Sequence, residues 1–382
     1  MNHRRRFLLT ASLLALFAAT PAARAQFTFL NIADNTGPTF SGFLGNPSLN
    51  SGGTVAFTAG LDGGGTGIFT GAGGATTTIG LTNEPIFQSF STVPLINTAG
   101  TVAFGAILDV GGSGIFSFTN GVQTDIALSS GPTFSGVGYT SLNAAGTVAF
   151  RAFLDAGGTG IFTGAGGATT AIAETSGPTF SSVGTATAIN AAGAVAFYAN
   201  LDAGGGGIFS ITSGVQTDIA LSDGPTFSSF EFNISINTAG TVAFAAALDA
   251  GGNGIFTSAG GAATTIALST GPTFSTLSGS LPSINTAGTV AFLASLDAGG
   301  QGIYVGDGSG TTRVIGTGDT LFGSTVIGLD FGTAGLNDDG QLAFRYSLAD
   351  GTGGVAVATV PEPGSALLLC AGLPFLLRRR RA

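Results

Sequence analysis

The chain has 382 residues, of which 44% are hydrophobic and only 8% are charged. Its 66 Gly residues follow no Gly-X-Y period, which excludes a collagen, and its 31 Phe residues supply enough apolar mass for a core, which argues against disorder. Residues 26–359 carry three Arg, no Lys and 19 acidic residues, a net charge of −16, so this part cannot neutralise phosphates and nucleic acid is not an expected partner.

Residues 1–25 have the three parts of a secretory signal peptide. Arg4, Arg5 and Arg6 form a positive segment, residues 7–19 are apolar, and residues 23–25 (Ala-Arg-Ala) offer a small-x-small cleavage site. The arginines before Phe7 also resemble a twin-arginine signal, so the general export route and the twin-arginine route both stay open. We expect the chain to be exported and residues 1–25 to be removed.

The body of the chain, residues 26–359, contains the motif Asn-x-x-Gly-x-Val/Leu-Ala-Phe seven times. The Asn of the motif stands at Asn50, Asn97, Asn143, Asn190, Asn237, Asn285 and Asn337. The Phe stands at Phe57, Phe104, Phe150, Phe197, Phe244, Phe292 and Phe344. Successive Asn residues are 47, 46, 47, 47, 48 and 52 residues apart. A period in this range is typical of a propeller, a solenoid or another repeat array.

Each copy is expected to form four short antiparallel strands. In the second copy the strands are expected at residues 91–96, 101–108, 114–118 and 122–128. Asn97 and Gly100 stand at the first and last positions of a tight turn, where a type I turn prefers them, and Asn120-Gly121 is a hairpin signal. Gly-Pro-Thr-Phe at residues 131–134 breaks the pattern and leads to the next copy. Because no part of the body has a sustained helical period, the sequence predicts an all-β fold.

Four-stranded sheets arranged radially are propeller blades, so seven copies favour a seven-bladed β-propeller. The last copy supplies only three strands, the third at residues 354–357, whereas residues 27–40 match the closing part of a repeat such as residues 124–134. We therefore predict that the N-terminal strand completes the last blade and closes the ring, which removes the open edges. An open β-solenoid is the alternative, but no distinct end caps are visible. The seven motif Phe side chains are expected in the core.

The seven copies resemble the tandem repeat class with the Asn-x-x-Gly-x-x-Ala-Phe signature, which is found in exported proteins with various anchors. The resemblance covers about residues 27–358. The turn Asn97-Thr98-Ala99-Gly100 is also similar to the TolB-type propeller repeat, whose Ser-Pro-Asp-Gly turn precedes an Ile-Ala-Phe strand, although the Pro-Asp pair is absent here. This second resemblance implies the propeller fold alone, because one fold hosts many functions.

Residues 360–382 form a third region. It contains, in order, a Pro-Glu-Pro triplet, an apolar run over residues 366–377 and a terminal Arg cluster. The residues of the two polar parts are Pro361, Glu362, Pro363, Arg378, Arg379, Arg380 and Arg381. In this order they resemble the PEP-CTERM sorting signal of bacterial exosortase substrates. The resemblance implies an exosortase-type sorting enzyme as a partner, removal of the tail near the triplet, and release or attachment at the surface of a Gram-negative-type bacterium.

The physical properties of this tail agree with a temporary membrane hold. Four Arg residues favour the cytoplasmic side of the membrane. The 12-residue apolar run is shorter than the roughly 20 residues that span a bilayer comfortably. We therefore expect a short hydrophobic helix in a membrane-inserted precursor, transiently placed in the inner membrane. A plain C-terminal anchor is the alternative.

Catalytic and metal-binding residue types are scarce in the body. The only His is His3 and the only Cys is Cys370, so nucleophilic triads, disulfides and zinc sites with N or S ligands are excluded there. Six acidic residues follow Leu beside Gly-rich turns, namely Asp62, Asp109, Asp155, Asp202, Asp249 and Asp297. We expect each carboxylate to cap its turn by accepting a hydrogen bond from the backbone two residues on. A ring of calcium sites is the alternative, and otherwise no cofactor is predicted.

The sequence thus predicts an exported cell-surface or extracellular-matrix protein that is not an enzyme. Its propeller is expected to have a structural or ligand-binding role, with an extracellular polysaccharide or a surface protein as partner. The alternative is a carboxylate-based extracellular enzyme that acts on polysaccharide in the propeller channel. Arg151, Arg313 and Arg345 stand outside the repeat pattern, and each lies either at the channel or, as we expect, at the surface.

Overall fold

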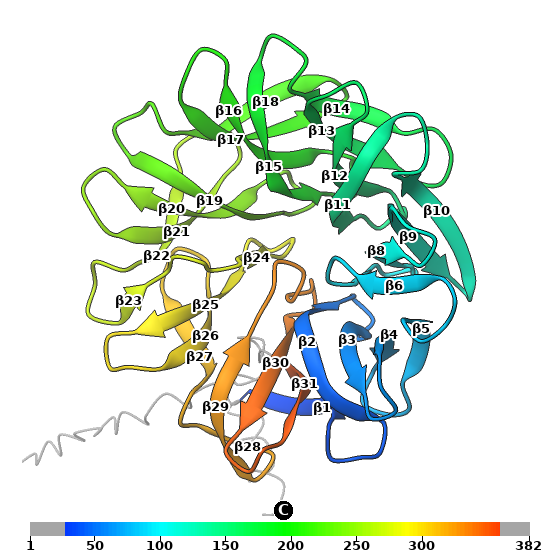
Figure 1. The fold of residues 1–382 in the computed structure, drawn as a ribbon. Coiled ribbons are helices and arrows are strands. Elements are labelled where there is room, and N and C mark those ends of the chain that lie inside the picture. The colour runs from blue at the N-terminus through cyan, green and yellow to red at the C-terminus, as the bar shows by residue number, and fades with distance from the viewer. Residues whose placement is uncertain (1–26, 360–382) are drawn as a thin grey trace, which may run out of the picture. The chain divides into compact units, whose positions relative to one another are not determined.

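The computed structural model describes residues 27–359, and every regular element in that range is a β-strand (Figure 1). The strands form seven antiparallel sheets that follow one another around a central channel, so the predicted seven-bladed propeller is confirmed. This part of the chain contains no helix that could span a bilayer. The predicted signal peptide (residues 1–25) and the predicted sorting segment (residues 360–382) lie outside the described residues.

The first four blades are built from consecutive strands, which follow one another from the channel outward. Blade 1 consists of β2 (Phe40–Leu49), β3 (Val55–Leu61), β4 (Thr66–Gly71) and β5 (Thr77–Leu81). Blade 2 has β6 (Phe87–Phe90) and β7 (Leu95–Ile96) at the inner position, then β8 (Val102–Leu108), β9 (Ser113–Thr119) and β10 (Val122–Leu128). Blade 3 consists of β11 (Phe134–Leu142), β12 (Val148–Leu154), β13 (Thr159–Gly164) and β14 (Thr170–Glu174). Blade 4 consists of β15 (Phe180–Ile189), β16 (Val195–Leu201), β17 (Gly206–Thr212) and β18 (Val215–Leu221).

The last three blades follow the same order. Blade 5 consists of β19 (Phe227–Ile236), β20 (Val242–Leu248), β21 (Asn253–Ser258) and β22 (Thr264–Leu268). Blade 6 has β23 (Phe274–Thr276) and β24 (Ser283–Ile284) at the inner position, then β25 (Val290–Leu296), β26 (Gln301–Gly306) and β27 (Thr311–Gly316). Blade 7 has β29 (Ser324–Asp330), which pairs with the short β28 (Thr320–Leu321), then β30 (Gln341–Leu348), β31 (Gly353–Thr359) and, outermost, β1 (Thr28–Asp34).

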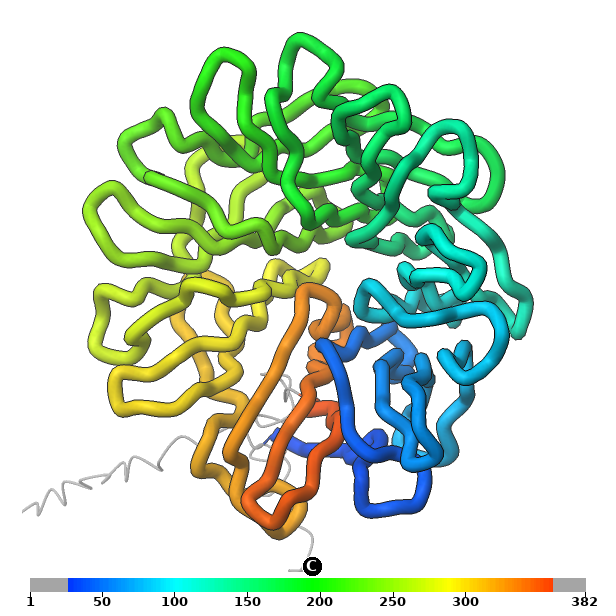
Figure 2. Tube along the Cα trace, in the orientation of Figure 1, coloured from blue at the N-terminus to red at the C-terminus, as the bar shows by residue number. Residues whose placement is uncertain are grey.

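The N-terminal strand closes the ring. β1 pairs antiparallel with β31, from Thr28 opposite Thr359 to Asp34 opposite Gly354. Figure 2 shows the dark blue start of the described chain beside its red end. The predicted closure is therefore confirmed, and the alternative of an open solenoid is wrong. The physical reason is that the pairing satisfies the backbone groups of β31 that a solenoid would leave exposed at an edge.

In blades 1 to 6 the core is an aromatic cluster between the three inner strands, whereas blade 7 combines Phe344 with Val326 and Ala356 at the equivalent positions. All seven motif Phe side chains are buried, as predicted. In blade 2, the ring of Phe104 lies 5.5 Å from that of Phe87 and 6.0 Å from that of Phe116. Val102 and Ala103, which precede Phe104, are also fully buried, since a blade packs against a neighbour on each face.

The inner strands begin earlier than the sequence pattern suggested. The Gly-Pro-Thr-Phe segments were expected only to break the pattern, but their final Phe starts the inner strand and enters the aromatic cluster. These buried residues are Phe40, Phe134, Phe180, Phe227 and Phe274, and Phe87 takes the same place in blade 2. Of the strand expected at residues 91–96, only Leu95–Ile96 (β7) is present; the first piece of the inner strand, β6, ends at Phe90, because the chain between the two pieces bulges toward the channel.

Candidate functional site

The seven motif Asn residues form a closed ring of hydrogen bonds around one end of the channel. The Nδ2 of each Asn donates to the backbone carbonyl of the Asn in the next blade, over 2.9–3.5 Å. The last of these bonds, from Asn337 to Asn50, crosses the seam where the ring closes. The Oδ1 of each Asn accepts from the backbone N–H four residues on, at 2.8–3.0 Å. All seven side chains are buried.

These Asn residues were predicted as turn formers, and the turn itself is present. In the second copy, the Gly100 N–H donates to the Asn97 carbonyl at 2.9 Å, and Gly100 has a φ of 80° that glycine adopts without strain. The link between blades was missed, because it joins residues that are 46 to 52 positions apart in sequence, or 287 at the seam. The Asn ring therefore has a structural role, with both polar groups of each side chain already used.

The inner strands bulge into the channel just before the Asn ring. In blades 1, 4 and 5, three inner residues stand opposite one residue of the neighbouring strand, at residues 45–47, 184–186 and 231–233. The three segments read Gly-Asn-Pro, Gly-Thr-Ala and Glu-Phe-Asn. The bulges thus differ from copy to copy, whereas the motif around them repeats. Bulges re-aim side chains and are frequent beside functional sites.

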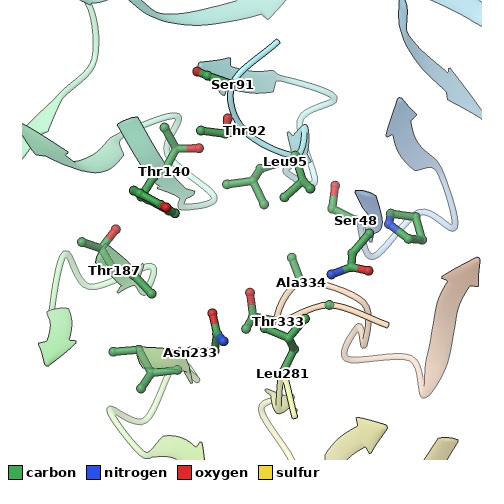
Figure 3. A pocket seen from close by; sticks show the side chains of 17 residues that line it. Ser48, Ser91, Thr92, Leu95, Thr140, Thr187, Asn233, Leu281, Thr333 and Ala334 are labelled. Atoms are coloured by element: carbon green, nitrogen blue, oxygen red, sulfur yellow. The ribbon is translucent and has the colours of Figure 1, made fainter. Parts of the chain in front are cut away.

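These bulges surround a cavity of about 290 Å³ in the channel (Figure 3). Every blade contributes to its wall. Representative lining residues are Ser48, Leu95, Thr140, Thr187, Asn233, Leu281 and Thr333. The volume lies near the lower end of the range of about 300–1,000 Å³ that is typical of small-molecule pockets. The cavity is therefore large enough for one small ligand.

The wall of this cavity is neutral. Among the described residues that line it, the polar side chains are those of Ser, Thr, Asn and Tyr, and none is charged. Asn46, Ser91, Asn233 and Thr333 form no side-chain hydrogen bond with any part of residues 27–359. The hydroxyl oxygen of Thr140 is buried and also lacks a partner in this range. The side chains of Asn46, Ser91, Asn233 and Thr333 are at least partly exposed, so the wall has hydrogen-bonding capacity for a ligand or water.

Among the residues that line the cavity, Tyr139 has an unusual backbone conformation. It lies inside β11 with a φ of 47°, and its side chain is 54% exposed. The register moves from Gly138 opposite Arg151 to Thr140 opposite Phe150, so the bulge of blade 3 is this single residue. Blade 3 has one residue fewer here than blades 1, 4 and 5. The sequence carried a signal of this, since Asn97 and Asn143 are 46 rather than 47 residues apart.

The six repeated Asp residues do not line the cavity. Their side chains are exposed, and none forms a side-chain hydrogen bond within residues 27–359, so the predicted capping of the turn by the carboxylate is wrong. The backbone N–H of each Asp forms a hydrogen bond instead. The Asp155 N–H donates to the Thr133 carbonyl at 3.1 Å, and the other five copies repeat this bond. Among the described residues, no three or more His, Cys, Asp or Glu side chains form a group that could hold a metal ion.

Asp338 is the one carboxylate among the described residues that line the two pockets at the Asn ring end. Its Oδ1 already accepts from the Thr286 N–H at 2.7 Å. A glycosidase-type mechanism needs two carboxyl groups across the bond to be cleaved. Among residues 27–359, no carboxylate lines the cavity of Figure 3, and Asp338 is the one carboxylate that lines the two pockets at the Asn ring end.

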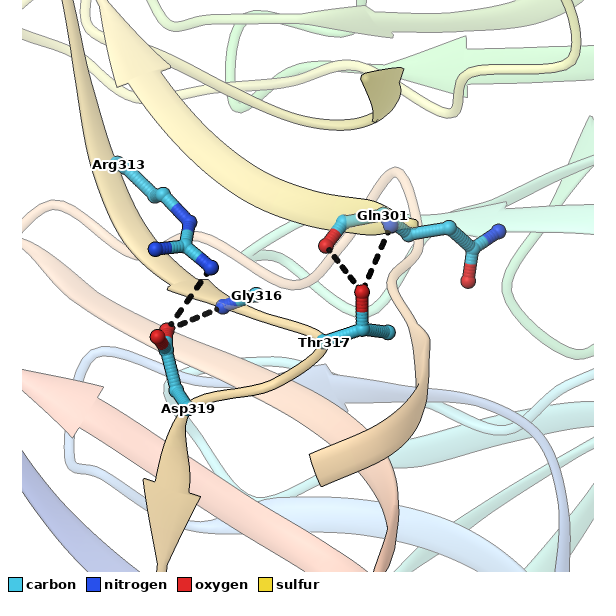
Figure 4. Close-up of polar contacts among 5 residues, drawn as sticks. All are labelled: Gln301, Arg313, Gly316, Thr317 and Asp319. Atoms are coloured by element: carbon cyan, nitrogen blue, oxygen red, sulfur yellow. Dashed lines mark hydrogen bonds and ion pairs between the residues drawn. The ribbon is translucent and has the colours of Figure 1, made fainter. Parts of the chain in front are cut away.

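None of the three Arg residues lines the channel cavity shown in Figure 3. Arg313 belongs to the outer strand β27 and pairs with Asp319 at 3.2 Å, and Asp319 also accepts from the Gly316 N–H (Figure 4). Arg345 links blade 7 to blade 1, because it pairs with Asp330 at 2.6 Å and donates to the Phe43 carbonyl at 3.1 Å. Their structural roles agree with the expectation that they lie away from the channel.

Arg151 has a different environment. Its guanidinium lies 4.4 Å from the ring centre of Phe153. Burial lowers the pKa of Arg151 from its ordinary value, while the neighbouring Tyr139 acts in the opposite direction. Since guanidinium pKa values are very high, the side chain stays charged at neutral pH. Its contact with Phe153, which stays half-exposed, is a cation–π interaction.

Comparisons with known proteins agree with this architecture. The sequence profile of a family of unknown function (DUF7453) matches residues 31–367. No curated protein sequence matches the chain. Among solved structures, an oligogalacturonate lyase from Vibrio parahaemolyticus is similar with a TM-score of 0.56 at 12% identity, covering 88% of this chain and 97% of the lyase.

An acylaminoacyl peptidase from Pyrococcus horikoshii is similar with a TM-score of 0.53 at 11% identity. The match covers 87% of this chain and 55% of the peptidase, so the chain spans about half the length of that protein. At such low identity, both similarities establish the propeller fold and carry no information on activity.

Proposed function

Because the chain belongs to this family of unknown function, whose profile spans nearly the whole ring, we propose a function from the site itself: an exported surface protein that binds a small ligand in its propeller channel. The observation that carries this proposal is the cavity built from seven non-repeating inner segments. Where a repeat serves only structure, its copies need no local differences. Here the motif residues repeat in all seven blades, and the segments that face the cavity differ.

The destination of the protein is part of the proposal. Residues 1–25 supply the export signal, and residues 360–382 supply the features of an exosortase sorting signal. The chain would then reach the cell surface or the extracellular matrix, where an extracellular polysaccharide or a surface protein is the partner. The role is non-catalytic, and the net charge of −16 on residues 26–359 keeps nucleic acid away.

Intact-mass measurement of the protein recovered from its own host tests the destination. We expect a form that starts near Gln26 and ends near Pro363. A form that retains Arg381 would count against exosortase sorting and would favour the plain anchor.

Filling the channel tests the ligand-binding role. Ala186 lines the cavity and is partly exposed to it, so Ala186→Phe places a ring in the space where the ligand would lie. The full chain would be screened by saturation-transfer NMR against a library of sugars, amino acids and nucleosides. We expect at least one compound to bind the wild type and to lose binding in this variant.

The matched control is Ala75→Phe, at an exposed position in the loop between β4 and β5, which should bind like the wild type. If no compound distinguishes Ala186→Phe from Ala75→Phe, the channel is not a binding site and the ring is structural.

A further inference from the structure

We propose that the ligand of the channel is a neutral, polyhydroxylated molecule of about one sugar ring, which stacks on Tyr139. This inference rests on the proposed function and specifies the chemical class of its ligand. It is carried by three independent properties of the cavity: the absence of charge on its described wall, the unpaired polar groups, and the strained aromatic residue in blade 3.

The absence of charged side chains from the described wall disfavours ionic ligands. A charged ligand that leaves water for a cavity of about 290 Å³ needs an opposite charge there, and no described side chain that lines this cavity carries one. Glu231 stands in the same bulge as Asn233 but does not line the cavity, and it accepts a hydrogen bond from the Ser278 hydroxyl at 2.6 Å. A neutral ligand therefore fits the wall better than an acid or an amine.

The hydrogen-bonding groups of the wall suit a molecule with many hydroxyls. The side chains of Asn46 and Asn233 each offer an amide donor and an amide carbonyl, and Ser91 and Thr333 offer hydroxyls. Between these polar groups lie apolar side chains such as Val93, Ile234 and Leu281. Such alternation matches a sugar ring, which has polar edges and an apolar face.

Tyr139 supplies the flat surface for that apolar face. Among residues 27–359, four non-glycine residues have a positive φ. Asn120, Ser213 and Phe322 each precede a glycine in a tight turn, where this conformation is ordinary. Tyr139 instead lies within a strand, where glycine would avoid the steric cost. An aromatic residue that is kept in a strained and half-exposed position beside a cavity indicates a role for its side chain.

The experiment compares affinity with stability in the full chain. The probes are D-glucose, D-galactose, D-mannose and L-fucose, with D-glucuronate and D-glucosamine as charged counterparts. Titration calorimetry measures affinity, and the thermal midpoint measures stability. We expect at least one neutral sugar to bind more tightly than its charged counterparts.

Tyr139→Gly separates the side chain from the backbone strain. We expect it to weaken the binding of that sugar at least about tenfold, without lowering the thermal midpoint, because glycine adopts this φ freely. Tyr139→Phe keeps the ring and should bind within about threefold of the wild type. Asn120→Gly gives the same backbone relief in an exposed turn between β9 and β10 and should leave the affinity unchanged.

The outcomes distinguish this inference from the proposed function. If Tyr139→Gly binds the neutral sugar as well as the wild type does, the assignment of Tyr139 is overturned. If a charged sugar or another library compound binds in an Ala186→Phe-sensitive manner while the neutral sugars do not, the ligand class is overturned and the channel keeps its role. If nothing binds in the channel, both proposals fall.

Discussion

At the scale of single residues, the motif Asn explains why this residue type recurs in all seven copies. An Asn at the first position of a type I turn is common, but Asp or Ser would serve that turn as well. An Asp carboxylate lacks a donor and a Ser hydroxyl has one oxygen for both roles, whereas the Asn amide carries its donor and its acceptor on two separate atoms; Asn190 uses its Nδ2 for the carbonyl of the next blade and its Oδ1 for the N–H of its own turn, at 3.1 Å and 3.0 Å. The residue therefore joins two blades while it shapes a hairpin.

Asn190→Ala tests this double role. It leaves the Asn237 carbonyl and the Ala194 N–H without their side-chain partners in a buried region. The Ala194 N–H left unpaired costs about 1–3 kcal/mol, and the lost bond to the Asn237 carbonyl, which keeps its bond from the Gly240 N–H, about 0.5–1.5 kcal/mol, so we expect a loss of about 2–4 kcal/mol in the free energy of unfolding. Urea unfolding followed by circular dichroism measures the change.

The control for this loss is Asn83→Ala, at an exposed position that should change the stability by less than about 0.5 kcal/mol. Equal losses in the two variants would show that the hydrogen bonds of the Asn ring add nothing to stability.

At the scale of elements, the closing strand β1 is held by more than its backbone pairing. The Tyr346 hydroxyl donates to Asn31 Oδ1 at 3.0 Å, and the Gly353 N–H donates to Asn35 Oδ1 at 2.8 Å. Burial raises the pKa of Tyr346 well above its ordinary value, so the hydroxyl stays a donor at neutral and moderately alkaline pH. The N-terminal strand is thereby fixed to blade 7 by side chains as well as by the ladder.

Ile32→Ala tests how much β1 contributes. The side chain of Ile32 is only 4% exposed and packs in one cluster with Phe57 of blade 1 and Val355 of blade 7. Replacing a buried Ile by Ala typically costs about 2–5 kcal/mol, and we expect a loss in that range from thermal or urea unfolding.

Two positions earlier on the same strand, Leu30 is 49% exposed, so Leu30→Ala is the matched control and should cost less than about 1 kcal/mol. If Ile32→Ala were as stable as Leu30→Ala, β1 would not be part of the cooperative unit.

At the scale of the whole molecule, the described ring is interrupted within a blade rather than between blades. The last residue of β31, Thr359, stands opposite the first residue of β1, Thr28. The equivalent strands of blade 2, β9 and β10, are joined there by the two-residue turn Asn120-Gly121. The open position of blade 7 is therefore a hairpin without its turn, and the sheet itself holds the two ends together.

Circular permutation tests the value of this arrangement. Thr359 would be joined to Thr28 by Asn-Gly, and the chain opened between Ser130 and Gly131, in the connection between blades 2 and 3. The two ends of this permutant belong to different blades, so no single sheet holds them together. We therefore expect it to fold with a thermal midpoint several degrees below that of the unpermuted chain. Circular dichroism and calorimetry measure both properties.

The matched permutant is opened between Gly73 and Gly74, between β4 and β5 of blade 1. It again shares one sheet between the two ends, so its midpoint should stay closer to that of the natural order. If the two permutants melt together, closure within a blade has no stabilising effect.

The sequence by itself determined the number of blades, their four-stranded antiparallel pattern and the closure by β1, because the turns and the strand pattern are local features that recur seven times and the divided last repeat is visible in the sequence. The Asn residues and the core Phe residues could be found in the same way. Only the tertiary structure decided the hydrogen-bonded Asn ring and the neutral cavity, since these join residues from seven blades that are about 47 positions apart. It also decided that the Asp carboxylates form no hydrogen bond within residues 27–359, whereas the backbone N–H of each Asp bonds to the carbonyl of the residue that precedes the inner strand of its blade. The conformation of Tyr139 depends on the register between β11 and β12, which is shifted because blade 3 has one residue fewer at its bulge. The pattern of residue types alone does not show which residues of the two strands that register places opposite each other.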